Sequence, residues 1–327
     1  MSFTISGATL SGGIVLTPPG GSPSPSPSPT PSLSYGYTSG GKLAPGTPTW
    51  SVSNVIDKFA FSSDGNASDV GDLTVARAQA SGQSSSSNGY TSGSRTGPAL
   101  GDNIIDKFPF ASDGNATDVG DLTVARSYAS GQSSSDNGYT SGGLQITPGP
   151  NVAQNVIDKF SFTSDGNATD VGDLTNSVLA PSGQSSSTSG YASGGSSPGN
   201  TNVINKFPFA SDNNASNVGT LTRSIAYGTG QSSSTNGYFS AGYDSVYSNI
   251  IEKWPFASDG NATDVGDLTV ARYGPAGQSS ADNGYTSAGN SGSSSNVIDK
   301  FPFASDSNAT DVGDLTESKE DPAGQQG

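Results

Sequence analysis

A nine-residue loop, written DGNATDVGD in its second copy, is rich in the carboxylate and amide oxygens that calcium prefers. An EF-hand loop needs glycine at its sixth position and glutamate at its twelfth, but counting from Asp113 these positions hold Asp118 and Val124. The fourth copy, which starts at Asp212, loses two carboxylates while it keeps its length. The loop is therefore predicted to form Asx turns between strands. A looser calcium site is the lesser alternative, and no other metal or cofactor is expected.

Histidine and cysteine are both absent from the 327 residues. Their absence excludes histidine-based acid–base catalysis, Ser-His-Asp and Cys-His nucleophiles, zinc fingers and disulfides. A net charge of −15 disfavours binding to nucleic acids and to anionic membranes, because both carry negative charge. No run of 18 apolar residues is present, so no membrane insertion is expected. No catalytic residue is assigned, and the protein is predicted not to be an enzyme.

The acidic loop belongs to a unit that occurs six times along the chain. A tetrapeptide of the type Ile-Asp-Lys-Phe begins at Ile56 and recurs at intervals of 49, 52, 47, 47 and 47 residues. In every copy the leucine of the GDLT-type motif follows 17 positions after that isoleucine, and the glutamine of GQ follows 10 positions later. Such fixed spacing indicates packed, regular structure and not a disordered polar chain.

The residue types within one unit predict four short strands. Asn54–Phe61 is β-branched and aromatic, and a second strand is expected around Gly71–Arg77. The small-residue segment GQSSS predicts another strand, and Asn88-Gly89 after it suits a type I′ hairpin turn that leads into Tyr90–Gly93. Four strands in each unit, without helical periodicity, are typical of the blades of a β-propeller.

The two ends of the repeat region complement each other. The last copy stops at Gly324–Gly327, before its tyrosine strand, and the missing strand is found at Ser34–Gly41. Pairing these ends would close a ring and leave no free edge between the first and last blades. The predicted fold class is all-β, a six-bladed β-propeller of four-stranded blades over residues 33–327, closed by N- and C-terminal strands in one blade.

Residues 1–32 differ in composition from the repeats. A Ser-Pro tract over residues 20–32 is predicted to be an extended, semi-rigid linker. Residues 1–19 are predicted to be a short β anchor that docks on a partner assembly, with a frayed tail as the alternative. Since no basic residue precedes Lys42, no signal peptide is expected. The candidate anchor residues are Phe3, Ile5, Leu10, Ile14 and Leu16.

The order of motifs in each unit, LTVAR, a small-residue strand, NG, GYTSGG and VIDKF, resembles a kelch repeat. The double glycine of that family is kept in three copies, at residues 40–41, 142–143 and 194–195, and changed in the others. Galactose oxidase is similar to kelch propellers, but its copper chemistry needs histidine and cysteine and cannot be carried over. The acidic loop also resembles the Asp box of sialidase-type propellers. It lacks the closing tryptophan, and the arginines (Arg77, Arg95, Arg126, Arg223 and Arg272) are not expected to converge.

The repeat sequence IDKFPFASDGNATDVGDLT, with GQSS and NGYTSGG, is also similar to repeats in structural proteins of marine bacteriophages, cyanophages especially. This resemblance implies a decoration or tail-fibre protein on the virion surface, extracellular when it acts and attached to other virion proteins through residues 1–19. Host-surface glycan, a receptor or another virion protein would be its partner. An extracellular adhesin or matrix protein of a cell is the main alternative, and a propeller glycosidase or sialidase-like enzyme is the third.

Length variation marks one set of loops as the candidate binding face. The longest loops between the second and third strands, Lys42–Asn54, Ser94–Asn103 and Leu144–Asn155, fall in three consecutive units. Such loops emerge on one face of a propeller, where insertions commonly mark the binding site. The tryptophan in the first loop is predicted either to stack on a sugar ring or to cover the adjacent blade. The candidate ligand-binding residues are Lys42, Trp50, Arg95, Gln145 and Asn151.

Three sets of repeated polar residues have structural interpretations. The glutamines of GQ are predicted to bond backbone groups between inner strands. The alternative is that they form a polar ring around the central channel. The asparagines of Asn-Ala-Ser/Thr are predicted to be turn residues and not glycosylation acceptors. The Asp and Lys of IDKF point to opposite strand faces and are predicted to contact neighbouring blades separately. The glutamines are Gln83, Gln132, Gln184, Gln231, Gln278 and Gln325, and the asparagines are Asn66, Asn115, Asn167, Asn214, Asn261 and Asn308.

Overall fold

The computed structural model describes residues 34–43, 50–98, 100–146 and 151–327. By its internal contacts the chain divides into Met1–Pro31 and Ser32–Gly327, and the described residues all belong to the second unit. The proposed anchor residues Phe3, Ile5, Leu10, Ile14 and Leu16 and the proposed linker over residues 20–32 lie outside the described residues. Every regular element in the described part is a β-strand, which confirms the all-β prediction.

The strands form six sheets of four or five strands and one of three, all antiparallel where they pair. Sheet 1 contains β28 (Ala323–Gln326), β1 (Tyr35–Ser39), β3 (Val55–Ala60) and β4 (Ser68–Asp72). Sheet 2 contains β5 (Ser81–Ser84), β6 (Asn88–Gly97), β7 (Leu100–Pro109) and β8 (Thr117–Asp121). Sheet 3 contains β10 (Ser130–Ser133), β11 (Asn137–Ser141), β14 (Val156–Ser161) and β15 (Thr169–Asp173).

Sheet 4 contains β16 (Ser182–Ser185), β17 (Ser189–Ser193), β18 (Val203–Pro208) and β19 (Ser216–Thr220). Sheet 5 contains β20 (Thr229–Ser232), β21 (Asn236–Ser240), β22 (Ser248–Pro255) and β23 (Thr263–Arg272). Sheet 6 contains β24 (Ala276–Ser279), β25 (Asn283–Ser287), β26 (Ser295–Pro302), β27 (Thr310–Glu320) and β2 (Lys42–Leu43). The small sheet contains β9 (Arg126–Ser127), β12 (Leu144–Gln145) and β13 (Val152–Ala153).

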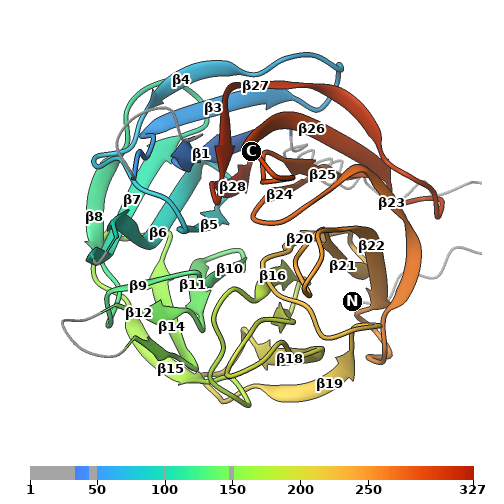
Figure 1. Ribbon diagram of the computed structural model, residues 1–327. Coiled ribbons are helices and arrows are strands. Elements are labelled where there is room, and N and C mark those ends of the chain that lie inside the picture. The colour runs from blue at the N-terminus through green and yellow to red at the C-terminus, as the bar shows by residue number, and fades with distance from the viewer. Residues whose placement is uncertain (1–33, 44–49, 99, 147–150) are drawn as a thin grey trace, which may run out of the picture. The chain divides into compact units, whose positions relative to one another are not determined.

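The six larger sheets are arranged around a common centre, with the strand that carries the repeated glutamine innermost in each (Figure 1). Neighbouring inner strands contact each other in the order β5, β10, β16, β20, β24 and β28, and β28 also contacts β5. Within each sheet the strand order follows the predicted order of motifs, since GQSS pairs with GYTS, GYTS with VIDKF and VIDKF with DVGD. This is a propeller-like architecture.

Strands from the two ends of the described unit lie side by side in sheet 1. β1 pairs with β28 in antiparallel register, from Gly36 opposite Gln326 to Ser39 opposite Ala323. On its other edge β1 pairs with β3, so the tyrosine strand from the N-terminal side occupies the second position that the last repeat leaves empty. The predicted pairing of the two terminal segments is therefore present.

The outer strand lies earlier in the repeat than its residue types predict. In sheet 1 it covers Ser68–Asp72 instead of Gly71–Arg77. Beyond Asp72 the pairing with the neighbouring segment is reduced to single bonds, from Leu73 N–H to Asn54 O at 2.7 Å and from Arg77 N–H to Ser53 O at 3.0 Å. Only in sheets 5 and 6 does the outer strand continue through the predicted residues, with β23 reaching Arg272 and β27 reaching Glu320.

The hairpin between the two inner strands is not the predicted type I′ turn. Ser84 pairs with Gly89, and the N–H of Ser85 donates to Asn88 O at 2.9 Å, so three residues, 85–87, connect β5 to β6. A type I′ turn requires positive φ at both central residues, and neither Asn88 nor Gly89 has it. The glycine has a different role, since an added Cβ would lie 2.3 Å from the ring of Phe108 on the paired strand. The corresponding glycine faces an aromatic ring in all six sheets.

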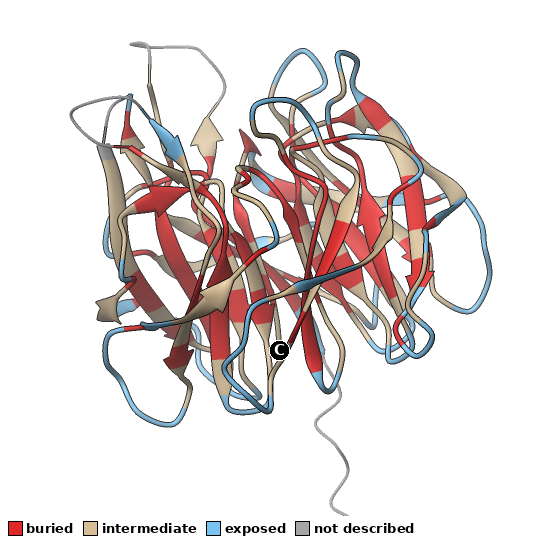
Figure 2. Ribbon diagram, turned by 90° about the horizontal axis from the view of Figure 1, so that it is seen from below, coloured by how far each residue is buried: buried red, intermediate tan, exposed pale blue. Residues whose placement is uncertain are grey.

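The hydrophobic core is divided into six clusters, each shared by two neighbouring sheets. In one cluster Tyr37 and Leu73 of sheet 1 pack against Phe108 of sheet 2, and the Tyr37 ring stacks on Phe110 with centroids 4.9 Å apart. Figure 2 shows buried residues along the middle of the strands and exposed residues in the connecting loops. A chain with only 31% hydrophobic residues can fold in this way because each interface needs one small, repeated set of rings and aliphatic side chains.

The inner strands pack too closely for side chains at one position. A Cβ added to Gly131 would lie 2.1 Å from the backbone oxygen of Gly82, and the equivalent glycine of every inner strand faces the same obstruction at 2.0–2.3 Å. Glycine at this position is therefore required by close backbone approach and not by backbone dihedral angle. The high glycine content of the sequence reflects this central packing.

Candidate functional site

The six repeated glutamines hold neighbouring sheets together. Each side chain is at most 2% exposed, and its amide nitrogen donates to the backbone oxygen of a repeated tyrosine in the next sheet at 2.9–3.0 Å. The series runs through all six sheets, because Gln325 in sheet 1 bonds Tyr90 in sheet 2. Buried amides that satisfy backbone acceptors have no free donor to offer a ligand, and the interpretation as structural residues agrees with their positions.

The repeated acidic loop is used in the same way. Lys58 pairs with Asp113 of the next sheet at 2.9 Å, and the side-chain oxygen of Asn115 accepts from the N–H of Asp72 at 3.0 Å. Both contacts recur at all six interfaces. Asp69 forms the predicted Asx turn by accepting from Gly71 N–H at 3.1 Å. The described residues contain no group of three or more acidic side chains arranged to hold a metal ion.

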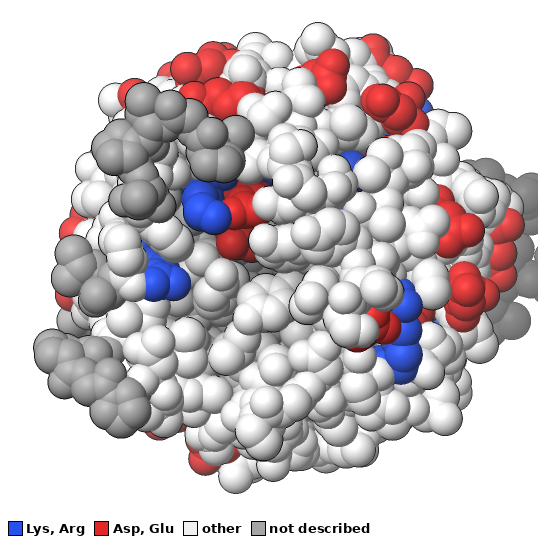
Figure 3. Space-filling model, in the orientation of Figure 1, with Lys and Arg blue, Asp and Glu red and all other residues white. Residues whose placement is uncertain are grey.

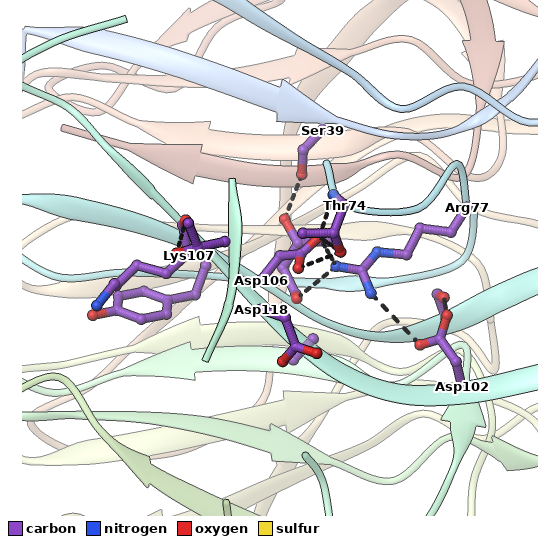
Figure 4. Close-up of polar contacts among 12 residues, drawn as sticks. Ser39, Thr74, Arg77, Asp102, Asp106, Lys107 and Asp118 are labelled. Carbon is purple, nitrogen blue, oxygen red and sulfur yellow. Dashed lines mark hydrogen bonds and ion pairs between the residues drawn. The ribbon is translucent and has the colours of Figure 1, made fainter. Parts of the chain in front are cut away.

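Four interfaces contain a buried ion pair. Arg126 of the small sheet bonds Asp158 of sheet 3 at 3.0 Å, both side chains are fully buried, and Thr123 also donates to Asp158 at 2.6 Å. Figure 4 shows the equivalent Arg77, which lies between Asp102 and Asp106, while Lys107 points to the other face of its strand. The remaining two pairs are Arg272 with Asp299 and Lys319 with Asp57. The three arginines of these pairs therefore occupy separate interfaces.

In these ion pairs burial shifts each pKa toward the neutral form of the group, and the charged partner shifts it in the opposite direction. Burial lowers the pKa of the Arg126 guanidinium, although the nearby Asp158 carboxylate counteracts it. Burial also raises the pKa of the Asp102 carboxyl, while Arg77 and the hydroxyl of Ser94 act to lower it. These shifts are consequences of packing between sheets and give no acid–base pair facing solvent.

Three of the five proposed ligand-binding residues come together. The guanidinium of Arg95 lies 4.6 Å from the centroid of the partly buried Trp50 ring, and the Lys42 ammonium lies 5.6 Å from it. Lys42 also forms an ion pair with Glu320, which is buried. Arg95 and Lys42 therefore both lie beside the Trp50 ring. These cation–π contacts stabilise the three side chains in this arrangement.

The other two proposed residues belong to a different loop. Gln145 lies on β12, opposite Arg126 on β9, and its side-chain oxygen accepts from Gln154 at 3.1 Å. Asn151 is exposed and precedes β13. Within the described residues no contact joins either of them to Trp50, so the five residues do not form one site.

A second group of residues, which the repeat analysis did not single out, surrounds the centre of the sheets. The residue four positions before each repeated glutamine has φ between +53° and +62°, although only one of the six is glycine. Their backbones form a ring in which each N–H donates to the previous member's oxygen at 2.7–3.2 Å. We call this ring the mouth, and its members are Gln79, Tyr128, Ala180, Tyr227, Gly274 and Asp321.

Tyrosines extend from the mouth toward the rim. The rings of Tyr128 and Tyr227 lie edge to face with centroids 5.3 Å apart, and Tyr273 follows at 6.2 Å from Tyr227. Tyr247 is 5.6 Å from Tyr273, and Tyr243, 38% exposed, is 5.9 Å from Tyr247. None of these five tyrosines belongs to the repeated core set. The sequence signal for them is that they depart from an otherwise fixed repeat.

Asp321 is the one acidic member of the mouth. Its side chain is partly buried, and burial raises the pKa of its carboxyl to about 7, with the neighbouring Glu320 adding to the rise and Gln79 lowering it. The Gln79 amide donates to it at 3.4 Å and to the Tyr128 hydroxyl at 2.5 Å. Figure 3 shows one face of the described unit, where the area around the centre is mostly uncharged and acidic side chains gather toward the periphery.

No protein-family model matches the chain, and no curated protein sequence matches it either. Among the described residues there is no helix of the length and apolarity needed to cross a membrane.

Proposed function

We propose that this protein is a closed six-bladed β-propeller that acts by binding and display, without catalysis. The observation that carries the proposal is the division of its polar residues into two classes. Those that recur in every repeat are used in contacts between sheets, as with Gln132 and Lys107. Those that depart from the repeat, such as Trp50, Arg95 and Tyr227, gather in the loops between the second and third strands and at the mouth.

Closure of the ring is supported by the same contacts. β1 and β28 pair with each other, and the glutamine-to-tyrosine bonds and the mouth bonds each return from sheet 1 to sheet 2. A radial arrangement of the sheets leaves only short edge strands, which limits edge-to-edge association and suits a protein exposed at high local concentration. In our proposal it is a decoration or fibre protein on a virion surface, held to other virion proteins through residues 1–19.

The binding partner that fits the Trp50 loop best is a host-surface glycan. An aromatic ring flanked by Arg95 and Lys42 offers an apolar face and hydrogen-bond donors together, a combination that suits the faces and hydroxyls of sugars. The rival proposal, an extracellular adhesin of a cell, uses the same surface, so the location of the protein distinguishes the two. Mass spectrometry of purified virus particles should detect the chain, whereas its presence only in cell envelopes would favour the adhesin.

The binding role is tested with the purified full-length chain on an array of bacterial surface polysaccharides. Binding to at least one polysaccharide is expected, and Trp50→Ala should weaken it about tenfold or more, as for a central aromatic contact. Val270→Ala is the matched control, since this side chain is 43% exposed on the outer strand β23. Equal binding by Trp50→Ala and the unmodified chain would remove the glycan site at this loop.

A further inference from the structure

The mouth surrounds a small, open cavity at the centre of the sheets. Its volume is about 70 Å³, and its lining includes Gln79, Tyr128, Tyr227 and Asp321. On this measure one water molecule needs about 10–15 Å³, so the cavity has room for the head group of a ligand. The ligand must therefore reach in from outside with one end.

The charge in this cavity is not balanced by the protein. Glu320 is paired with Lys42 and also accepts hydrogen bonds from Asn290 and Tyr273. Asp321, by contrast, forms no ion pair with a described lysine or arginine, and Lys42 acts on it only at longer range. A partly buried carboxylate without a cationic partner is held in an unfavourable environment, and a bound cation would relieve it.

The shape of the wall favours an organic cation over a metal ion. Tyr128 and Tyr227, whose rings touch edge to face with centroids 5.3 Å apart, both line the cavity, and ammonium groups are attracted to the faces of such rings. A metal ion would need several oxygen ligands, whereas this part of the described chain supplies one carboxylate. Gly274 leaves room for the acid, because a Cβ there would lie 2.3 Å from the Asp321 carboxylate oxygen.

We propose that the mouth binds a primary ammonium group, carried by an amino sugar of the glycan whose sugar chain contacts the tyrosines outside. The ammonium group would enter the cavity beside the two tyrosine rings and pair with Asp321. Tyr273, Tyr247 and Tyr243 then provide aromatic surface for the sugars that follow, in a continuous series of ring contacts. The amino-sugar part rests on the proposed glycan-binding function, while the ammonium site rests on the cavity alone.

The test uses the full-length chain and three small probes: glucosamine, N-acetylglucosamine and n-butylammonium. Binding is followed by NMR line broadening of the probe and by calorimetry. Glucosamine should bind, and N-acetylglucosamine, which has the same ring without the charge, should bind about tenfold more weakly or not at all. Equal binding of these two sugars overturns the proposal. Tighter binding of glucosamine than of n-butylammonium supports an amino sugar, whereas equal affinities overturn that part and leave an ammonium site.

Two variants locate the site. Asp321→Asn removes the charge and should weaken glucosamine about tenfold, since asparagine tolerates the φ of +55° found at this position. Asp282→Asn removes the same charge from an exposed hairpin and should leave the affinity unchanged. Tyr227→Leu keeps an apolar side chain but loses the ring, and it should also weaken binding. Unchanged affinity in both mouth variants would refute the site. Polysaccharide binding that persists in Asp321→Asn would refute only this inference and not the proposed function.

Discussion

Replacing one member of a buried ion pair should destabilise the protein strongly, and replacing both should not. Asp158→Asn should keep both bonds from Thr123, because in the equivalent Asn205 one amide oxygen accepts from the N–H and the hydroxyl of Thr175. It leaves the Arg126 guanidinium fully buried beside a neutral partner, with one remaining bond to Thr140 O at 2.8 Å. Loss of one partner from a buried pair costs about 3–5 kcal/mol, so a fall of about 3 kcal/mol in the free energy of unfolding is expected.

The chain itself contains the neutral version of this interface. Between sheets 3 and 4 the positions of Arg126 and Asp158 are taken by Val178 and Asn205, and Asn205 still accepts from the Thr175 hydroxyl at 2.6 Å. The double replacement Arg126→Met with Asp158→Asn should therefore lie within about 1 kcal/mol of the unmodified protein, since apolar replacements of a buried pair are often neutral. The two positions would then be coupled by at least about 2 kcal/mol.

Urea unfolding followed by tryptophan fluorescence measures these differences, because Trp254 is completely buried and reports loss of packing. Asp165→Asn is the control, as it removes the exposed ion pair with Lys107 at the same interface and should cost less than about 1 kcal/mol. If the effects of the two single replacements simply add in the double variant, the buried pair contributes no coupling and the reasoning is wrong.

Two further predictions concern the centre of the molecule. Gly131→Ala should lower the free energy of unfolding by about 3 kcal/mol, because the new methyl group lies 2.1 Å from Gly82 O. Gly114→Ala, which meets no atom within 4 Å, should change it by less than about 0.5 kcal/mol, and similar effects of both in urea unfolding would contradict the packing argument. Asp321, whose pKa burial raises to about 7, keeps its proton in the folded chain over a range in which the unfolded chain loses it. Its contribution to stability therefore falls between about pH 4 and pH 7, by on the order of 2–4 kcal/mol. Thermal unfolding of Asp321→Asn across this range should lack the fall, and identical pH profiles for both proteins would exclude it.

Residue types that recur at fixed spacing allowed accurate expectations for the repeated part of the fold. The strand at Asn54–Phe61, the small-residue inner strand and the pairing of the two terminal segments could all be predicted because each is specified by local β propensity and by the missing strand of the last repeat. The hairpin could not. Asn88-Gly89 has the local signature of a tight turn, yet the glycine serves close contact with Phe108, and only the neighbouring strand reveals that requirement.

The candidate site was harder to predict than the fold. Trp50, Arg95 and Lys42 were found through loop length, and the structure places them in contact, but Gln145 and Asn151 came from a loop that lies apart from them. The mouth was missed. Its six members sit at one position of the repeat, but they share a backbone conformation and not a residue type, so no sequence pattern connects them.

The sequence by itself determined the repeating unit of this protein, its strand order and the residues that join one unit to the next. The reason is that the same residue types at the same spacing form the same strands and contacts in each copy. Tertiary structure decided which departures from the pattern meet. The arrangement of the sheets around a common centre brings positions that are about 50 residues apart in sequence into hydrogen-bond contact, as when Tyr128 N–H donates to Gln79 O at 2.9 Å. Asp321 and Tyr128 become neighbours in the same way although most of the chain separates them. The Asp321 carboxylate, which has no cationic partner among the described residues, is therefore placed beside Tyr128 only by the arrangement of the sheets around a common centre.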